Sequence, residues 1–181
     1  MRKILKSALV LGAVSLAGAG ALNAQAGASF HVGGGVVLPM GDFGDAFKTG
    51  FQALGGVNFA LGSLPFDIRV DAIYGQNSGD DAVFTVDDVK AKFFGGMAGA
   101  QFGFGAPGAS VHPYILGQVG VVNGKTTCTG CADNSSSDFT FLGGAGVNFG
   151  KFFVEGKYMS IQSDASANML VVSAGISFGG N

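Results

Sequence analysis

The 181-residue chain contains no tryptophan and only two cysteines, and only 12% of its residues are charged. Two cysteines cannot complete a zinc tetrad, and a formal net charge of −2 gives no electrostatic basis for binding nucleic acid. Beyond residue 22, no apolar run approaches the roughly 20 residues of a membrane-spanning helix. A hydrophobic chain without such helices can still cross a membrane as a closed β-barrel, because closure satisfies every backbone hydrogen bond.

The N-terminal segment has the layout of a targeting signal. Three basic residues within the first six precede an apolar run over residues 8–22, and small-residue cleavage patterns end at Ala24 and Ala26. We predict a secretory signal peptide over residues 1–24, cleaved after Ala24 or Ala26; a retained anchor is the alternative. Residues 27–181 then form one domain. Removal of three basic and no acidic residues changes its net charge from −2 to −5.

The segment from Phe66 to Tyr74 carries an acid or a base at every second position up to residue 71. Successive side chains of a strand point to opposite faces, so this segment predicts a strand with one ionic face and one apolar face. The ionic face carries Asp67, Arg69 and Asp71. A soluble sheet could turn these charges to water, but their recurrence behind an export signal favours a barrel with lipid outside and polar groups inside.

Seven further segments fit the same strand pattern and are separated by connections rich in Gly, Pro, Asp or Ser. The eight predicted strands cover residues 29–39, 50–61, 66–74, 89–104, 111–122, 138–149, 152–160 and 169–178. The connections at 40–49, 75–88, 123–137 and 162–168 are predicted to be long, and those at 61–64, 105–110 and 149–151 short. Outer-membrane barrels combine an even strand number with short periplasmic turns and longer extracellular loops. The pattern therefore predicts an all-β, eight-stranded, antiparallel up-and-down transmembrane β-barrel.

Aromatic residues gather near the ends of the predicted strands, as expected of the girdles at the two membrane interfaces. The periplasmic set is Phe30, Phe59, Phe66, Phe102, Phe104, Phe149, Phe152 and Phe178, and the outer set is Phe51, Tyr74, Phe139, Phe141 and Tyr158. Lys90 and Lys92 conflict with the pattern, since they fall on the apolar face of their strand. Either they lie above the bilayer, or a bulge near Gly95 and Gly96 changes the register.

The chain resembles the small outer-membrane β-barrel proteins, the OmpA/OmpX-like or "porin family" barrel domain, over essentially its whole length beyond the signal. The resemblance is carried by the stretches at residues 33–43, 49–51, 113–115, 153–158 and 174–178. It implies the barrel fold and insertion by the outer-membrane assembly machinery. It does not specify a task, since members of the family serve as structural links, adhesins, narrow channels and occasionally enzymes.

The charges predicted to face the lumen are Asp67, Arg69, Asp71, Glu155 and Lys157. An eight-stranded barrel is just wide enough for side chains to fill, and an isolated buried ion costs several kcal/mol, so these groups should pair. We predict a salt-bridged plug. The alternative is a narrow passive channel for small solutes or ions. A plugged lumen offers no substrate cleft, so we expect no enzyme activity.

Other candidate groups lie in the predicted outer loops. Cys128 and Cys131 lie in the third of these loops, where an exported protein favours a disulfide over redox or metal chemistry. The second loop carries Asp80, Asp81, Asp87 and Asp88, which read as a solvated acidic loop rather than a Ca²⁺ site because their spacing does not match an EF-hand. His31 and His112 are too far apart in sequence for ligand spacing and are interpreted as polar lumen residues. No metal or cofactor is predicted.

The sequence thus predicts a monomeric protein of the cell outer membrane, with a structural or surface-interacting role through its outer loops. Its expected partners are outer-membrane lipid and lipopolysaccharide, with the assembly machinery acting during insertion, and no nucleic acid. A lipid-modifying membrane enzyme is one rival, although the long loops contain no histidine. A soluble lipocalin-like barrel is another, and it would require an apolar interior and a polar exterior.

Overall fold

The structure, a computed structural model, describes residues 27–62, 64–86, 88–105, 110–130, 134–163 and 166–179. The predicted signal peptide lies outside these residues. The elements are β1 (Gly27–Met40), α2 (Asp42–Ala46), β2 (Gly50–Ala60), β3 (Asp67–Ser78), β4 (Lys90–Gly103), β5 (Val111–Thr127), β6 (Asn134–Phe149), β7 (Phe152–Gln162) and β8 (Ala167–Gly179). No helix among the described residues is long and apolar enough to cross a membrane.

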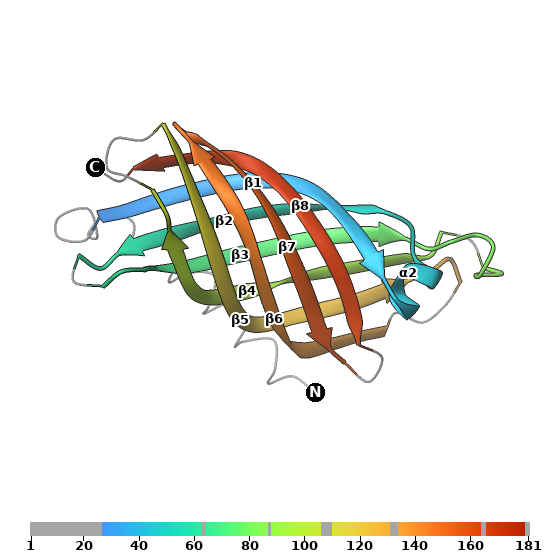
Figure 1. The fold of residues 1–181 in the computed structure, drawn as a ribbon. Coiled ribbons are helices and arrows are strands. Elements are labelled where there is room, and N and C mark those ends of the chain that lie inside the picture. The colour runs from blue at the N-terminus through green and yellow to red at the C-terminus, as the bar shows by residue number, and fades with distance from the viewer. Residues whose placement is uncertain are drawn as a thin grey trace.

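The eight strands form a closed antiparallel barrel in which each strand pairs with its sequence neighbours and β8 pairs with β1 (Figure 1). The predicted eight-stranded up-and-down barrel is therefore confirmed, and each predicted segment contains one strand. Several strands run further than expected. β5 continues to Thr127 and β6 begins at Asn134, since backbone pairing in this hairpin extends past the last residue that fits the apolar alternation.

The strands are staggered as they wind around the barrel. A path through directly paired residues goes once around the barrel, from β1 through β2 to β8. It starts at Ser29 and returns to β1 at Pro39, ten residues further along the strand. A stagger of ten residues over eight strands corresponds to a tilt of about 40° from the barrel axis. Gly95 and Gly96 keep the continuous register of their neighbours, so the bulge considered there is wrong and Lys92 stays on the outer face.

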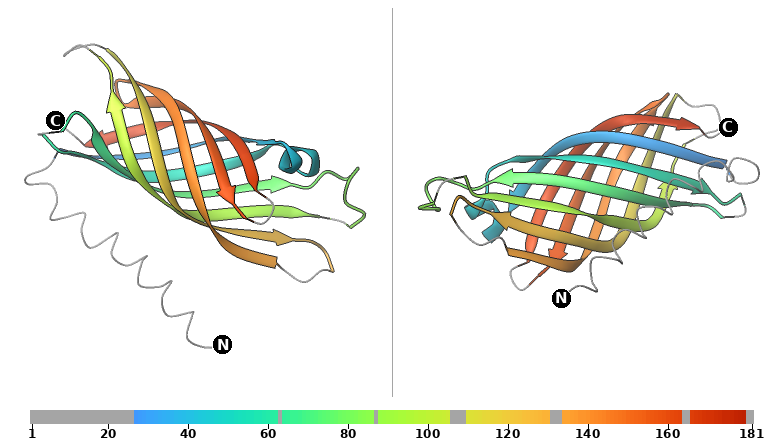
Figure 2. Two further views of the ribbon diagram at one scale, coloured as in Figure 1. Left: turned by 60° about the horizontal axis from the view of Figure 1, so that its bottom comes forward. Right: turned by 180° about the vertical axis from the view of Figure 1, so that it is seen from behind.

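The two ends of the barrel differ (Figure 2). The end that carries α2 and the connections at residues 41–49, 79–89, 128–133 and 163–166 is called the loop end, and the opposite end, where β1 begins and β8 finishes, the turn end. The predicted contrast in length holds for 41–49 and 79–89. It fails for 128–133 and 163–166, which are no longer than the turn-end connection 61–66, because the strands on either side extend into the segments predicted to be loops.

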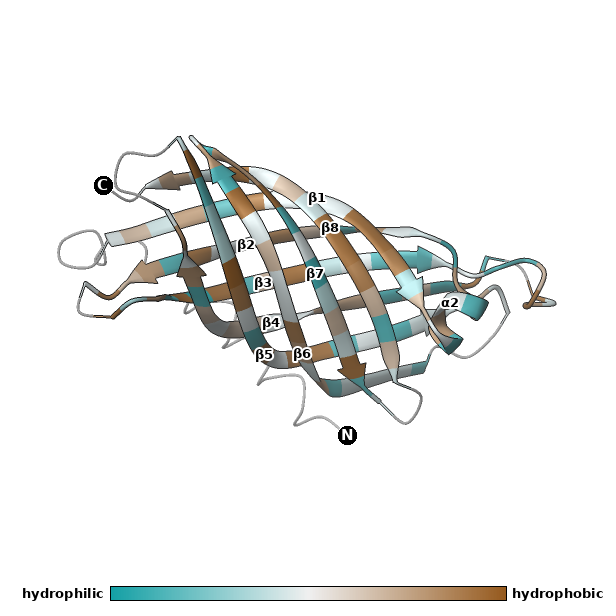
Figure 3. Cartoon of the chain, in the orientation of Figure 1, coloured by the Kyte–Doolittle hydropathy of each residue, from teal (hydrophilic) through white to brown (hydrophobic). Residues whose placement is uncertain are grey.

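The outer surface is apolar along the strands, and hydropathy alternates from one residue to the next (Figure 3). Exposed aromatic side chains ring both ends of the apolar surface. Near the turn end, Phe149 stacks with Phe152 and Phe30 with Phe178, while Phe51 packs on Tyr74 toward the loop end. Two aromatic bands separated by an aliphatic band match the predicted girdles in position.

Candidate functional site

The interior of the barrel, in the half nearer the turn end, holds a layer of ionisable side chains, which we call the ionic layer. It consists of His31, Arg69, Asp71, Glu155 and Lys157. Each of the five is no more than 5% exposed. The two cations and two carboxylates balance, so the layer has no net charge while His31 is neutral. Such a balance is what makes a charged cluster tolerable inside a protein.

Arg69 connects opposite walls of the barrel. Its Nε donates to Asp71 Oδ2 over 2.9 Å on its own strand, and its Nη1 donates to Glu155 Oε2 over 2.9 Å. Arg69 lies on β3 and Glu155 on β7, which are four strands apart and therefore face each other in an eight-stranded barrel. The guanidinium thus spans the lumen, and its planar fork of donors can bind two carboxylates at once.

Glu155 receives three donors. Besides Arg69, the ammonium group of Lys157 donates to Oε1, and the hydroxyl of Tyr114 donates to Oε2 over 2.9 Å. Glu155 and Lys157 are two residues apart on β7, so their side chains leave the same face of the strand. The carboxylate is 1% exposed and saturated with donors, which keeps it out of contact with water.

His31 completes the layer at Asp71. Its Nε2 lies 2.5 Å from Asp71 Oδ1, and an ionised carboxylate can only accept, so the proton resides on Nε2. Gly56 provides the space for this contact, since a Cβ at residue 56 would lie 2.7 Å from His31 Nε2. The sequence indicated that His31 faces the lumen but gave no sign of its partner, which lies 40 residues away.

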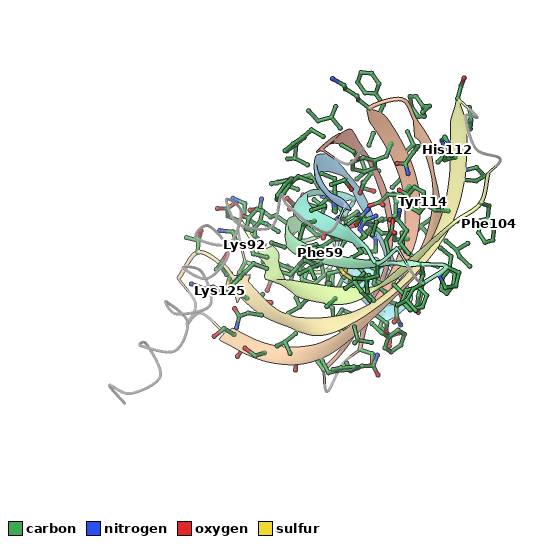
Figure 4. The ribbon with its side chains drawn as sticks, turned by 90° about the vertical axis from the view of Figure 1, so that its left-hand side faces the viewer. Phe59, Lys92, Phe104, His112, Tyr114 and Lys125 are labelled. Carbon is green, nitrogen blue, oxygen red and sulfur yellow. The ribbon has the colours of Figure 1, made fainter. Side chains whose placement is uncertain are left out.

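Asp67 lies apart from the other predicted lumen charges. It is half-buried at the rim of a polar cavity of about 230 Å³ that opens at the turn end, and no ion pair among the described residues includes it. His112 and Tyr114 line the same cavity, and Arg69 lies at its inner limit. Figure 4 looks into this end of the barrel and labels His112 and Tyr114 on β5. The cavity therefore ends at the ionic layer.

On the loop-end side of the ionic layer, the interior is mostly apolar, with Gln52 and Thr140 as buried polar exceptions. We call this part the apolar layer; it consists of Val37, Leu54, Ile73, Phe93, Met97, Val122, Leu142, Met159, Ile161, Met169 and Val171. On β3, Ile73 follows Asp71, and on β7, Met159 follows Lys157 in the same inward direction. The expectation of a polar interior is therefore wrong for this half. These residues occupy inward positions of the alternating pattern, so the sequence contained enough information to predict an apolar layer there.

Two glutamines lie within the interior without a protein partner. The side-chain amides of Gln52 and Gln118 are buried, and neither forms a hydrogen bond with another described residue. Both occupy inward positions of their strands, β2 and β5. Buried side-chain amides of this kind are commonly hydrogen-bonded to ordered water.

The acidic loop between β3 and β4 is ion-paired with lysines. Lys48 Nζ lies 2.8 Å from Asp81 Oδ2 and 3.8 Å from Asp80 Oδ1, and Lys90 Nζ lies 2.7 Å from Asp88 Oδ1. The hydrogen bond from Lys48 holds the pKa of Asp81 below its ordinary value, and the same bond raises the pKa of Lys48. Asp87 lies outside the described residues.

A metal site and a disulfide are the two remaining candidate sites. No group of three or more His, Cys, Asp or Glu side chains in the described part of the chain is arranged to hold a metal ion. Cys131 lies outside the described residues, so its pairing with Cys128 stays a prediction. The side chains of the ionic and apolar layers can together close a lumen. The charged groups of the ionic layer pair with one another, so they are not available to bind a substrate.

The fold is similar to that of several solved β-barrels. Neisserial surface protein A has a TM-score of 0.58 and 13% identity, covering 84% of this chain and 97% of that chain. The N-terminal β-barrel domain of Pseudomonas aeruginosa OprF has a TM-score of 0.51 and 15% identity, covering 85% and 100%. The Yersinia pestis outer membrane protein Ail, in a phospholipid bilayer nanodisc, has a TM-score of 0.51 and 18% identity, covering 85% and 100%.

No protein-family model and no curated protein sequence matches the chain. At identities below 20%, the likeness to these structures concerns the fold. The resemblance to small outer-membrane barrels, expected from the sequence, is confirmed at that level.

Proposed function

We propose that the chain is an integral protein of the cell outer membrane, with a closed lumen and a structural or surface-interacting role exercised through its loop end. The apolar outer surface, the two aromatic bands and the likeness to solved outer-membrane barrels support this proposal. A signal peptide would direct export and would then be cleaved after Ala24 or Ala26. The loop end would then face outward, and the turn end the periplasm.

The observation that carries the closed lumen is the Arg69–Glu155 ion pair across the barrel. Its two residues belong to opposite walls, so their contact blocks the axis rather than lining it. A permeating ion would have to displace a charge-balanced cluster whose side chains are at most 5% exposed, and breaking such buried pairs costs several kcal/mol. The apolar layer then presents a second barrier, since an ion loses its hydration there and meets few polar side chains.

The loop end offers surface for binding. Val83 and Val86 are 53% and 43% exposed on the loop between β3 and β4, and carboxylates flank them. We propose that outer-membrane lipid and lipopolysaccharide contact the barrel wall. The assembly machinery would bind the chain during insertion. We propose a non-enzymatic role for a monomer, without a metal or cofactor.

Conductance across planar bilayers tests the closed lumen. We expect the protein, purified in its folded form, to give no steady conductance, and an open porin inserted in the same way provides the positive control. Lys157→Gln should also give no steady conductance, because the apolar layer remains. The alternative, a narrow passive channel, requires steady pores in the unchanged protein. Steady pores whose conductance changes in Lys157→Gln would contradict the closed lumen.

A further inference from the structure

A cavity of about 280 Å³ opens at the loop end. The side chains of Phe93, Ile161 and Met169 form its floor, and these are members of the apolar layer that lie toward that end. Phe43 of α2 and Phe47 form a wall, and their rings are 4.8 Å apart. Figure 1 shows α2 at this end of the barrel, beside the start of β8. The cavity is thus an apolar cup set into the mouth of the barrel.

The rim of the cup is polar. Two hydroxyls, one ammonium group and one carboxylate line it, those of Thr126, Ser163, Lys125 and Asp138. Asp138 Oδ2 accepts a hydrogen bond of 2.6 Å from the Ser136 hydroxyl, which leaves the other carboxylate oxygen to accept from elsewhere. An apolar floor beneath a few polar groups is the usual composition of a site for a small organic molecule.

The barrel prevents the cup from collapsing. Its walls belong to β4, β5, β6 and β8, whose backbones are tied into closed hydrogen-bond ladders, so the strands cannot move inward to fill the space. An apolar cavity of roughly 150 Å³ can hold a benzene ring. The volume of about 280 Å³ therefore suits an apolar group of about twice that size.

We propose that this cup binds a small neutral amphiphile, a molecule with a compact alkyl or aromatic group and a hydroxyl. The apolar group would lie on Phe93 and Met169, and the hydroxyl would donate to Asp138 at the rim. Lys125 and Asp138 place opposite charges on the lining of the cup, so the cup as a whole favours no ion of one sign. The inference goes beyond the proposed function and holds whether or not the lumen conducts.

Methionine methyl groups provide a direct test with 1-hexanol as the probe. Met169 lies in the floor of the cup, whereas Met40 is 45% exposed on the outside of β1. In the folded protein in phospholipid nanodiscs, labelled with ¹³C at the methionine methyl groups, hexanol should shift the Met169 signal to a saturating value. The Met40 signal should change little, and then only in proportion to hexanol dissolved in the bilayer.

A matched pair of variants separates the cup from the membrane. Ala167→Phe fills the cup from β8, and Ala174→Phe places the same ring on the exposed outer face of that strand. Ala167→Phe should weaken hexanol binding by at least about ten-fold, the discrimination that an apolar pocket shows for one methylene group. Ala174→Phe should bind as the unchanged protein does. A Met169 shift that never saturates, or equal affinity in both variants, would overturn the proposal.

Discussion

At the scale of single residues, Glu155 holds the interior together. One carboxylate receives Arg69 from the opposite wall, Lys157 from its own strand and Tyr114 from β5. Each donor is itself buried, so loss of the carboxylate charge would leave two cations in a closed space. The stability of the barrel should therefore depend on this residue more than on any exposed charge.

Glu155→Gln keeps the shape of the side chain and removes its charge. We expect it to lower the free energy of unfolding by about 3–5 kcal/mol, because it leaves Lys157 without a counter-charge. Urea unfolding followed by far-ultraviolet circular dichroism measures this, since the chain has no tryptophan for fluorescence. Adding Lys157→Met should recover part of the loss.

Asp67→Asn is the matched control at the rim of the turn-end cavity. Because Asp67 is half-buried and outside the ionic layer, this substitution should change the free energy of unfolding by no more than about 0.5 kcal/mol. Equal effects of Glu155→Gln and Asp67→Asn would contradict the importance given to the ion pair across the lumen.

At the scale of strands, glycine is used to make room for large inward side chains. Gly75 on β3 lies directly opposite Phe93 on β4, and a Cβ at residue 75 would meet the Phe93 ring. Gly146 on β6 stands in the same relation to Tyr114 on β5. The small radius of an eight-stranded barrel forces such pairing, since two large residues cannot face each other across adjacent strands.

Gly75→Ala should destabilise the barrel by about 1–3 kcal/mol through overpacking against Phe93. Combining it with Phe93→Leu should restore part of the stability in a double-mutant cycle. Gly96→Ala is the control, because a Cβ at residue 96 meets nothing within 4 Å. If Gly96→Ala were as harmful as Gly75→Ala, loss of glycine flexibility rather than lack of space would be the cause.

The loops joining the strands contain a pH-dependent contact between Lys48 and Asp81. The Lys48 hydrogen bond lowers the pKa of Asp81 below 3.8, so this contribution is present above pH 3.8 and is lost as pH falls through the lowered pKa. The pKa of Lys48 is raised above 10.5, so its contribution is present below pH 10.5 and is lost as pH rises through the raised pKa.

We therefore expect the loop contact to stay constant between about pH 5 and 9. The Asp81 carboxyl carbon shift, followed by NMR across the acid range, checks this, with Lys48→Gln as the comparison. The Asp81 titration midpoint should move up toward its ordinary value in Lys48→Gln and in 1 M salt, since salt screens exposed charges. An unchanged midpoint in both would show that Lys48 does not set it.

At the scale of the whole molecule, the apolar surface lies on the outside and the charges on the inside. Val70 is 39% exposed midway between the aromatic residues Phe66 and Tyr74, while its neighbours Arg69 and Asp71 are buried. A soluble lipocalin-like barrel has the opposite arrangement, with an apolar interior and a polar exterior. The position of the charges therefore distinguishes this barrel from a lipocalin-like one. The apolar layer is the part of the interior that the two kinds of barrel share.

Val70→Arg tests the lipid-facing surface. In a bilayer it should destabilise the folded protein by about 2–4 kcal/mol, the cost of an arginine near the midplane. Val83→Arg, on a loop residue that is 53% exposed, should have almost no effect. Refolding in lipid vesicles with urea titration measures both. If Val70→Arg were neutral, and the protein were soluble without detergent, Val70 would face water.

The sequence by itself determined the strands and their faces, because alternation with a period of two depends only on neighbouring residues. It therefore predicted eight strands, an ionic face on β3 and β7, and the aromatic bands. It could not reveal that Arg69 meets Glu155, 86 residues away, since that contact depends on closure, which places β3 opposite β7. The partner of His31, the rim position of Asp67 and the apolar cup beside α2 were likewise decided by the tertiary structure. They depend on the register of the strands and on how side chains from different strands fill the lumen, which neighbouring residues in the sequence do not determine.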